Sequence, residues 1–423
     1  MKTAVLLPCA ALCLLFPSAS RAAAQKAFPP DRLYVVDATG ALLEFDEEGE
    51  YVETLDDDTA ALAFGPDGLL YVAGATGVRS LDADGDVIAG PFGGAFGGTP
   101  AGMCFGADGQ LFVAVHGAED AVIVLDVQQE AFVRSLALSA PLDSPLSLAP
   151  DGHVVGTFSA LASGGAAVLQ LVELETVGGQ LTAVDLADIA ETGSGAATFG
   201  PDGNQYFTTP HENRVTVRSP AGVSVAFIGT GAGLAAPTDL RFGPDGHLYV
   251  GSRDSDLVVV IDTTGNLVRT LGAGSPLDGP RQLAFAPRRF HAKLTGKLTG
   301  AAGKAETLKA DAEATFAPGL GCLMLTIEDD AGDALDFASL FGATLVFSGH
   351  QAAGTDEKSR RLQAACVLDA TLDAGFGAAD LTVKGKLDKD TGRFVPGKLS
   401  GPLLRAAAGR AFTGKFSTGK LIK

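Results

Sequence analysis

The chain has 423 residues, of which 46% are hydrophobic and 19% charged, with 55 glycines and no tryptophan. This composition favours short strands joined by tight turns over long helices, which would need more Glu, Lys and Leu at helical spacing. The net charge of −19 argues against nucleic acid as a partner, because phosphates require clustered Lys and Arg.

The charge is unevenly distributed along the chain. From Phe290 onward there are 17 basic and 15 acidic residues, whereas the preceding part has 14 basic and 35 acidic residues and a net charge of −21. No lysine lies between Lys26 and Lys293. We therefore expect two domains, residues 25–289 and residues 290–423.

Residues 1–24 have the features of an export signal. Lys2 precedes the 13-residue apolar run "AVLLPCAALCLLF", and small residues stand before Gln25. Such a run is too short to cross a bilayer, and no second apolar span follows. We expect the signal to be removed and the protein to be secreted or periplasmic, without a transmembrane span.

Removal of the signal would leave three cysteines. In an oxidising compartment, Cys322 and Cys366 are candidates for a disulfide because both lie in the C-terminal segment. Cys104 alternates with apolar neighbours and is expected to be a buried small hydrophobic residue.

A motif of the type FGPDG, followed by an aromatic or aliphatic strand, recurs through the first part of the chain. Its apolar residue is Phe64, Phe105, Leu148, Phe199, Phe242 and Phe285, at intervals of 41, 43, 51, 43 and 43 residues. A period of this length with strand–turn–strand texture is typical of an all-β propeller with four strands per blade.

The two ends of this repeat region complement each other. Residues 32–55 contain three strands but almost no first strand, and residues 281–287 form a first strand with nothing after it. Pairing the two fragments in one blade closes the ring and removes its exposed edges. The sequence therefore predicts six blades.

The unit "GNQYFTTPHENRVTVRSPAGVSVAFIGTGAGLAAPTDLRFGPDGHLYV" resembles an NHL repeat, and the resemblance extends over residues 28–288. Two enzyme groups share the six-bladed architecture that this implies. "PAGMCFGADGQLFVAVHG" is similar to a segment of the gluconolactonase-type hydrolases, and "GPDGNQYFTTPHENRV" to a segment of the streptogramin lyases.

Resemblance to the hydrolases implies a divalent cation held by oxygen ligands at the start of each innermost strand. The equivalent positions here are Ala60, Ala101, Ser144, Ala196, Thr238 and Arg281. Three alanines and an arginine cannot bind a hard cation. Asp239, one residue further along, is expected to point into its blade or sideways.

Resemblance to the lyases implies a catalytic His with acidic partners that hold magnesium. Their usual Phe-Thr-Glu is Phe207-Thr208-Thr209 here, so the acid is missing, although His211 and Glu212 follow closely.

Polar loop residues are expected on the face where the second and fourth strands end. They are His116, Glu119, Asp120, His211, Glu212, Asn213, Arg253 and Asp254, with Arg281 on an innermost strand. Two histidines with acidic neighbours have the groups for metal binding or acid–base work. The simpler interpretation is that they are solvated rim residues that contact a ligand or only water.

A weak calcium candidate is "LDADGDV", in which Asp82, Asp84 and Asp86 alternate. A full EF-hand loop requires a later glutamate and flanking helices, and other repeats hold an ordinary acidic turn at this place.

From Phe290 the sequence alternates in period two, as in "FHAKLTGKLTG", which indicates strands with one wet face. We expect a β-sandwich or a small β-barrel here and recognise no family.

Together these features predict a monomeric, exported propeller that binds a protein, peptide or glycan without catalysis and without a cofactor. The alternative is a metal-dependent lyase or hydrolase, with calcium or magnesium at the channel mouth.

Overall fold

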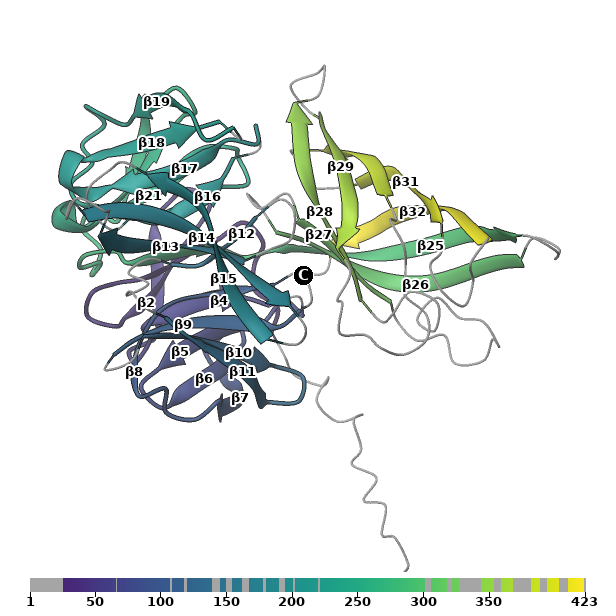
Figure 1. The fold of residues 1–423 in the computed structure, drawn as a ribbon, viewed down its shortest axis with the longest axis horizontal. Helices are drawn as coiled ribbons and strands as arrows, with labels where there is room; N and C mark the ends of the chain where they lie inside the picture. Colours follow the sequence, from purple (N-terminus) through teal and green to yellow (C-terminus); the bar gives the residue numbers. More distant parts are fainter. Residues whose placement is uncertain are drawn as a thin grey trace, which may run out of the picture.

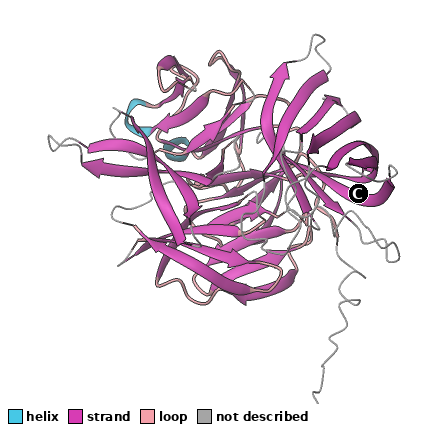
Figure 2. Cartoon of the chain, turned by 45° about the vertical axis from the view of Figure 1, so that its right-hand side comes forward, coloured by secondary structure: helices cyan, strands magenta, loops and turns pink. Residues whose placement is uncertain are grey.

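The computed structural model describes residues 26–65, 67–106, 109–117, 120–138, 145–149, 154–161, 167–177, 180–189, 195–200, 202–219, 221–300, 306–317, 322–327, 344–353, 359–367, 382–388, 394–402 and 410–421. The expected signal peptide lies outside this set. In these ranges the regular secondary structure is strand, apart from two short 3-10 helices, η1 (Pro210–Glu212) and η2 (Arg253–Ser255) (Figure 2). No helix in the described part of the chain is long and apolar enough to cross a membrane.

The first part of the chain is a β-propeller built of four-stranded antiparallel sheets, which we call blades (Figure 1). One blade contains β24 (Gln282–Phe285), β1 (Leu33–Val36), β2 (Leu42–Phe45) and β3 (Tyr51–Asp56). The next contains β4 (Ala61–Phe64), β5 (Leu70–Gly74), β6 (Gly77–Leu81) and β7 (Val87–Phe92). It is followed by β8 (Gly98–Phe105), β9 (Leu111–Gly117), β10 (Ala121–Asp126) and β11 (Ala131–Ala137).

Three further blades follow in the same order of strands. They contain β12 (Ser147–Leu148), β13 (Val154–Leu161), β14 (Ala167–Val177) and β15 (Gln180–Ile189); then β16 (Ala197–Phe199), β17 (Gln205–Thr209), β18 (Arg214–Arg218) and β19 (Ser224–Ile228); and then β20 (Pro237–Phe242), β21 (Leu248–Ser252), β22 (Leu257–Ile261) and β23 (Leu267–Leu271).

Where burial is described, the second strands of the blades are the most buried and the outermost strands the most exposed. Every residue of β5 and of β21 is buried, because these strands are packed by neighbouring blades on both faces. The outermost strands are the opposite: Val225 and Phe227 on β19 and Leu267 on β23 are each more than half exposed. The apolar side chains that alternate along the repeats therefore form a core between neighbouring blades. Their removal from water stabilises the ring.

The ring closes as the sequence predicted. β24 pairs antiparallel with β1 in the register Leu33↔Phe285 to Val36↔Gln282, so a strand from the end of the propeller completes the blade begun at its start. The Phe285 ring also meets the Tyr249 ring edge-on, with centroids 4.8 Å apart, which joins this blade to the preceding one.

The last glycine of each exact FGPDG motif has a conformation that the turn requires. Gly68, Gly203 and Gly246 have φ values of 79°, 81° and 82°, a left-handed conformation that costs glycine little. A side chain at any of these positions would strain the hairpin between the first two strands of a blade.

The C-terminal part forms a closed barrel, drawn beside the propeller in green to yellow in Figure 1. Its strands are β25 (Arg288–Gly300), β26 (Glu306–Ala317), β27 (Cys322–Ile327), β28 (Thr344–Ala353), β29 (Ser359–Val367), β30 (Thr382–Asp388), β31 (Phe394–Pro402) and β32 (Arg410–Leu421). β25 pairs with both β26 and β32, so the sheet closes on itself. Of the two arrangements left open by the sequence, the pairing is that of a barrel and not of a sandwich.

The strand order bears on the two cysteines expected to form a disulfide. Cys322 begins β27 and Cys366 lies on β29, and β28 pairs with both of these strands. Two strand spacings amount to about 10 Å, whereas disulfides join Cα atoms about 4.4–6.8 Å apart. This separation of the two strands does not favour the disulfide between Cys322 and Cys366. The disulfide stays a prediction from the sequence.

Candidate functional site

A cavity of about 820 Å³ opens at the mouth of the propeller channel, and we call it the mouth cavity. It is lined by the starts of innermost strands and the ends of second strands from blades all round the ring. The lining residues are Ala60, Thr99, Pro100, Ala101, His116, Pro145, Gly195, Ala196, Pro210, His211, Asn213, Ala236, Pro237, Thr238, Arg253, Asp254, Arg281 and Gln282. Its volume suits a small ligand or the end of a larger one.

Most of the rim residues expected from the sequence meet at this cavity. His116, His211, Asn213, Arg253, Asp254 and Arg281 all line it. Asp120 and Glu212 do not belong to its lining, and Glu119 lies outside the described residues. The two histidines come from blades that are not neighbours in the ring, yet both contribute to the same cavity.

The innermost positions inferred from the hydrolase resemblance also lie at the mouth cavity. Ala60, Ala101, Ala196, Thr238 and Arg281 line it, and Ser144 is not among the described residues. Their side chains are methyl groups, one hydroxyl and one cation. Among the described residues, no group of three or more His, Cys, Asp or Glu is placed to hold a metal ion.

Two equivalent loops shape one side of the rim. η1 follows β17 and ends at Asn213 with φ 51°, and η2 follows β21 and ends at Asp256 with φ 55°. Asn213 Oδ1 accepts a hydrogen bond from the Ala236 N–H at 2.8 Å, and Asp256 Oδ1 accepts one from the Gly279 N–H at 2.8 Å. Each left-handed residue thus fixes the connection that leads into the next innermost strand, so the Asn213 side chain has a structural task.

The acidic rim residues have partners within the protein. Nδ1 of His116 lies 2.7 Å from Oδ1 of Asp120, and that same oxygen also accepts the Gly117 N–H at 3.1 Å. Glu212 forms an ion pair with Arg214. These carboxylates are therefore engaged beside the mouth cavity and are not directed into it.

Below the rim, threonine hydroxyls join successive blades. Thr238 Oγ1 donates to the Pro280 carbonyl at 2.6 Å, and Thr208 Oγ1 donates to the Thr238 carbonyl at 3.0 Å. Gln282 uses its whole amide in the same way: its Oε1 accepts the Leu62 N–H at 3.0 Å and its Nε2 donates to the Leu62 carbonyl at 3.1 Å. These contacts hold the wall of the cavity in one geometry.

Arg241 is a central residue that the sequence did not single out. From β20 its guanidinium donates to Ser147 Oγ at 2.7 Å and to the carbonyls of Leu146 at 3.2 Å and Leu283 at 3.3 Å, so it joins three blades across the channel. Its charge is balanced by Asp239, whose Oδ1 lies 3.4 Å away.

Asp239 is directed towards the closing blade, which is one of the two directions expected from the sequence. It is fully buried, and its Oδ2 accepts the Leu283 N–H at 2.9 Å. Burial raises the pKa of its carboxyl, and the Arg241 guanidinium opposes that shift.

The proposed calcium residues form a turn. Asp82 is buried, and its Oδ1 accepts the backbone N–H groups of Asp84 at 3.0 Å and Asp86 at 3.1 Å. Asp262 occupies the same place in another blade and caps its turn through the N–H groups of Thr264 and Asn266, both at 2.9 Å. Hydrogen bonding alone therefore accounts for the aspartate at this position.

Cys104 is buried and unpaired, as expected for a small hydrophobic residue in the core, and burial raises the pKa of its thiol to about 12. Cys104 does not line the mouth cavity.

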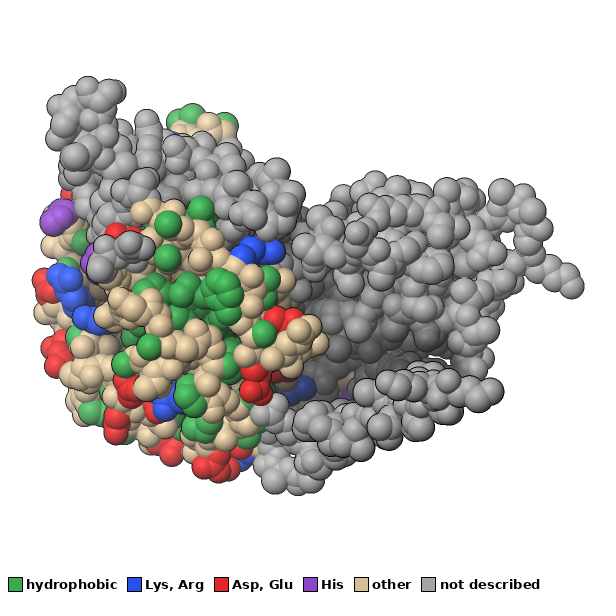
Figure 3. Space-filling view, turned by 60° about the horizontal axis from the view of Figure 1, so that its bottom comes forward, with side chains coloured by type: hydrophobic (Ala, Val, Ile, Leu, Met, Phe, Trp, Pro, Cys, Tyr) green, Lys and Arg blue, Asp and Glu red, His purple; other side chains and the backbone are tan. Residues whose placement is uncertain are grey.

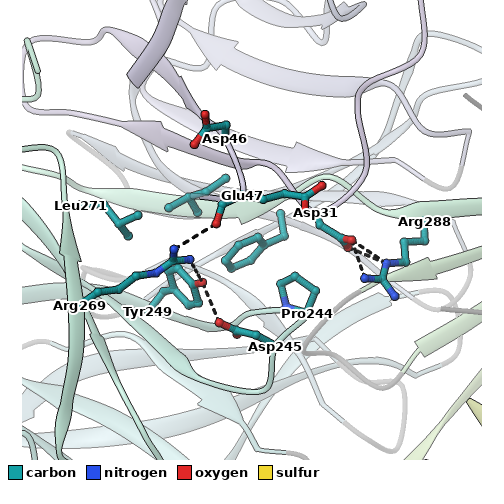
Figure 4. Close-up of a pocket in the computed structure, with 11 residues that line it drawn as sticks. Asp31, Asp46, Glu47, Pro244, Asp245, Tyr249, Arg269, Leu271 and Arg288 are labelled. Atoms are coloured by element: carbon teal, nitrogen blue, oxygen red, sulfur yellow. Dashed lines mark hydrogen bonds and ion pairs between the residues drawn. The ribbon is translucent and has the colours of Figure 1, made fainter. Parts of the chain in front are cut away.

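A smaller cavity of about 380 Å³ lies between the blade β20–β23, the closing blade and the start of β25 (Figure 4). Its two arginines are occupied: Arg269 donates to Tyr249 Oη at 2.8 Å and to the carbonyl oxygens of Glu47 and Glu48, and Arg288 Nε donates to both Asp31 oxygens, at 2.7 and 2.8 Å. The Arg288–Asp31 pair ties the first barrel strand to the propeller.

No protein family matches the sequence, and no curated protein is similar to it. Several solved structures align with the chain at low TM-scores. One is a protein of unknown function from Bacteroides caccae (TM-score 0.47, 13% identity, covering 61% of this chain and 99% of that one). Others are a catalytically inactive virginiamycin B lyase from Staphylococcus aureus with quinupristin (TM-score 0.40, 12% identity, 85% and 94% covered) and a putative 6-phosphogluconolactonase from Bacteroides uniformis (TM-score 0.41, 14% identity, 60% and 99% covered). At these scores no activity carries over, and the assignment of a β-propeller rests on the strand pairing of the chain itself.

Proposed function

We propose that this chain is an exported, six-bladed, NHL-like propeller that binds a protein, peptide or glycan at the mouth cavity without transforming it. The observation that carries the proposal is the convergence of rim residues from separate repeats on one cavity of about 820 Å³. Polar loop residues on a rigid scaffold are the usual means by which such folds recognise ligands.

The chemistry of the wall supports binding over metal catalysis. Three alanines, a threonine and an arginine occupy the described innermost positions, where a hard cation would need oxygen ligands. The carboxylates of Asp120 and Glu212 are held by His116 and Arg214, beside the cavity. The apolar run near the N-terminus supports export to the periplasm or the medium.

A blocked mouth tests the proposal. Ala60→Trp would place a large ring in the mouth cavity, and the matched control Leu267→Trp adds the same ring on the outer strand β23, where Leu267 is 51% exposed. Both variants and the wild type would be screened against the same peptide and glycan arrays.

Ligands bound by the wild type and by Leu267→Trp should be lost from Ala60→Trp. Equal binding by all three proteins, or no bound ligand on either array, would contradict a binding function at the mouth.

The second candidate is a metal-assisted lyase or hydrolase, favoured by the presence of both His116 and His211 in one cavity. It predicts that magnesium, calcium, manganese or zinc raises the melting temperature after EDTA treatment, and that His211→Ala abolishes the shift. A melting temperature that no ion changes would count against it.

A further inference from the structure

Arg281 differs from the other arginines of the propeller wall. It directly precedes β24, and its backbone N–H donates to the Val36 carbonyl at 2.8 Å, which fixes its position at the mouth cavity. Its side chain is exposed and, among the described residues, its guanidinium has no hydrogen-bond or ion-pair partner. By contrast, Arg269 and Arg288 of the smaller cavity, and Arg241 in the channel, are all held by protein oxygens.

Arg253 stands on the same side of the rim. Its Nε lies 3.0 Å from Oδ1 of Asp254, and both side chains are more than half exposed, at 55% and 60%. Arg253 packs over Gly279, where an added Cβ would lie 3.3 Å from Arg253 Cγ, and Gly279 is only two residues before Arg281. Arg253 and Arg281 therefore belong to one part of the rim.

The charge of the cavity is opposite to that of its surroundings. Its ionisable lining residues are two arginines, two histidines and one aspartate, and that aspartate already pairs with Arg253. The part of the chain before Phe290 carries a net charge of −21. Acidic side chains lie along the lower edge of the face drawn in Figure 3, and basic side chains are few there.

We propose that the mouth cavity binds an oxyanion, a carboxylate or a phosphate, through Arg281 with Arg253 as a second donor. This inference rests on the proposed binding function and names the chemical group that the ligand must carry. A guanidinium presents a planar pair of donors that matches carboxylate and phosphate, and such charge-assisted bonds are stronger than neutral ones. An arginine without a partner among the described residues, at a concave site of a domain with a net charge of −21, favours this group because the acidic residues of the propeller repel anions elsewhere on it.

The test is calorimetric titration of the full chain with citrate and, separately, with inorganic phosphate at one fixed low ionic strength. The wild type should bind one or both probes. Arg281→Gln should weaken binding by about 10- to 100-fold, the amount expected for loss of a charge-assisted hydrogen bond. Arg253→Gln should have a smaller effect, because this guanidinium is shared with Asp254.

Arg134→Gln is the matched control. Arg134 lies on the outer strand β11 and donates to Gln110 Oε1 at 2.8 Å, away from the mouth cavity. This variant removes the same charge and should bind both probes as the wild type does.

The two probes separate the sources of the oxyanion. Binding of citrate alone indicates a carboxylate ligand, and binding of phosphate alone indicates a phosphoryl group. If neither probe binds the wild type, or if Arg281→Gln binds as tightly as the wild type, the inference is overturned. Array ligands that are lost from Ala60→Trp but retained by Arg281→Gln would still leave the binding function intact.

Discussion

The Tyr249 hydroxyl donates a hydrogen bond to Oδ2 of Asp245 at 3.0 Å, while Oδ1 of Asp245 accepts the His247 N–H, also at 3.0 Å. The aspartate of the PDG turn thus fixes both its own turn and the strand after it. The same relationship recurs in two other blades, as Tyr71 with Asp67 at 2.8 Å and Tyr206 with Asp202 at 3.0 Å. Burial, with a smaller contribution from Asp245, raises the pKa of Tyr249 to about 12, so the hydroxyl stays a donor over the whole physiological range.

We expect Tyr206→Phe to destabilise the propeller by about 1 kcal/mol, because the ring keeps its packing while the hydrogen bond to Asp202 is lost. The free energy of unfolding in urea measures this. Tyr51→Phe is the control: it also removes a hydroxyl, but Tyr51 is 38% exposed and its hydrogen bond to Thr54 Oγ1 at 2.9 Å lies at the surface, where substitutions usually change stability by less than about 0.5 kcal/mol. Equal effects of the two substitutions would show that the Tyr–Asp contact contributes nothing particular.

Gln282→Leu should destabilise the protein by about 2 kcal/mol or more. Leucine preserves the apolar packing but leaves the N–H and the carbonyl of Leu62 without their partner in a buried site. Because this contact joins the closing strand to the neighbouring blade, amide hydrogen exchange should quicken first in β24 and β4. Gln128→Leu, in an exposed turn, should leave both the unfolding free energy and the exchange unchanged.

Much of the propeller could be predicted because its contacts are local and repeated. Each FGPDG motif specifies a turn glycine with positive φ, and the alternation around it specifies strands that pair with their immediate successors. The pairing of β1 with β24 was also predictable, since the first repeat lacks its first strand and the repeat region ends with a lone first strand. For the C-terminal domain the sequence predicted a sandwich or a small barrel without deciding between them, because the decision depends on β25 pairing with β32 at the far end of the domain.

The candidate site was predicted in part for a similar reason. Loop position within a repeat placed His116, His211 and Arg253 at the mouth cavity. Arg241 escaped notice because its partner Ser147 lies 94 residues away in the sequence, and an arginine within a strand suggests a solvent-facing side chain. The partner of Arg241 is fixed by the ring as a whole and not by any one repeat.

Asp262 should make the stability of the protein depend measurably on pH in the acidic range. Hydrogen bonds from the Thr264 hydroxyl and from Asn266 lower the pKa of its carboxyl below that of the unfolded chain. Its contribution to stability is therefore present above the ordinary aspartate pKa of about 3.9 and is lost as the pH falls through the lower folded value.

Asp262→Ala should accordingly reduce the melting temperature at pH 7, and the difference from wild type should narrow below about pH 4. Thr264→Val, which removes one donor to the carboxylate, should show the same trend with a smaller amplitude. Melting curves between pH 2 and pH 7 measure both. A difference for Asp262→Ala that stays constant over this range would contradict the argument.

Arg241→Met should be the most damaging of these substitutions, at about 3–5 kcal/mol, because it leaves the carboxylate of Asp239 buried without its counter-ion. Burial already raises the pKa of Asp239, and loss of Arg241 raises it further. A folded-state pKa above the unfolded one gives stability that is lost as the pH rises, so the deficit of Arg241→Met should be larger at pH 7 than at pH 4. The double variant Asp239→Asn/Arg241→Met removes the buried charge and should recover part of the lost stability at pH 7.

Urea unfolding of the wild type, both single variants and the double variant gives the coupling energy between Arg241 and Asp239. A coupling energy near zero would contradict the charge argument. It would show that Arg241 stabilises the channel only through Ser147 and the carbonyls of Leu146 and Leu283.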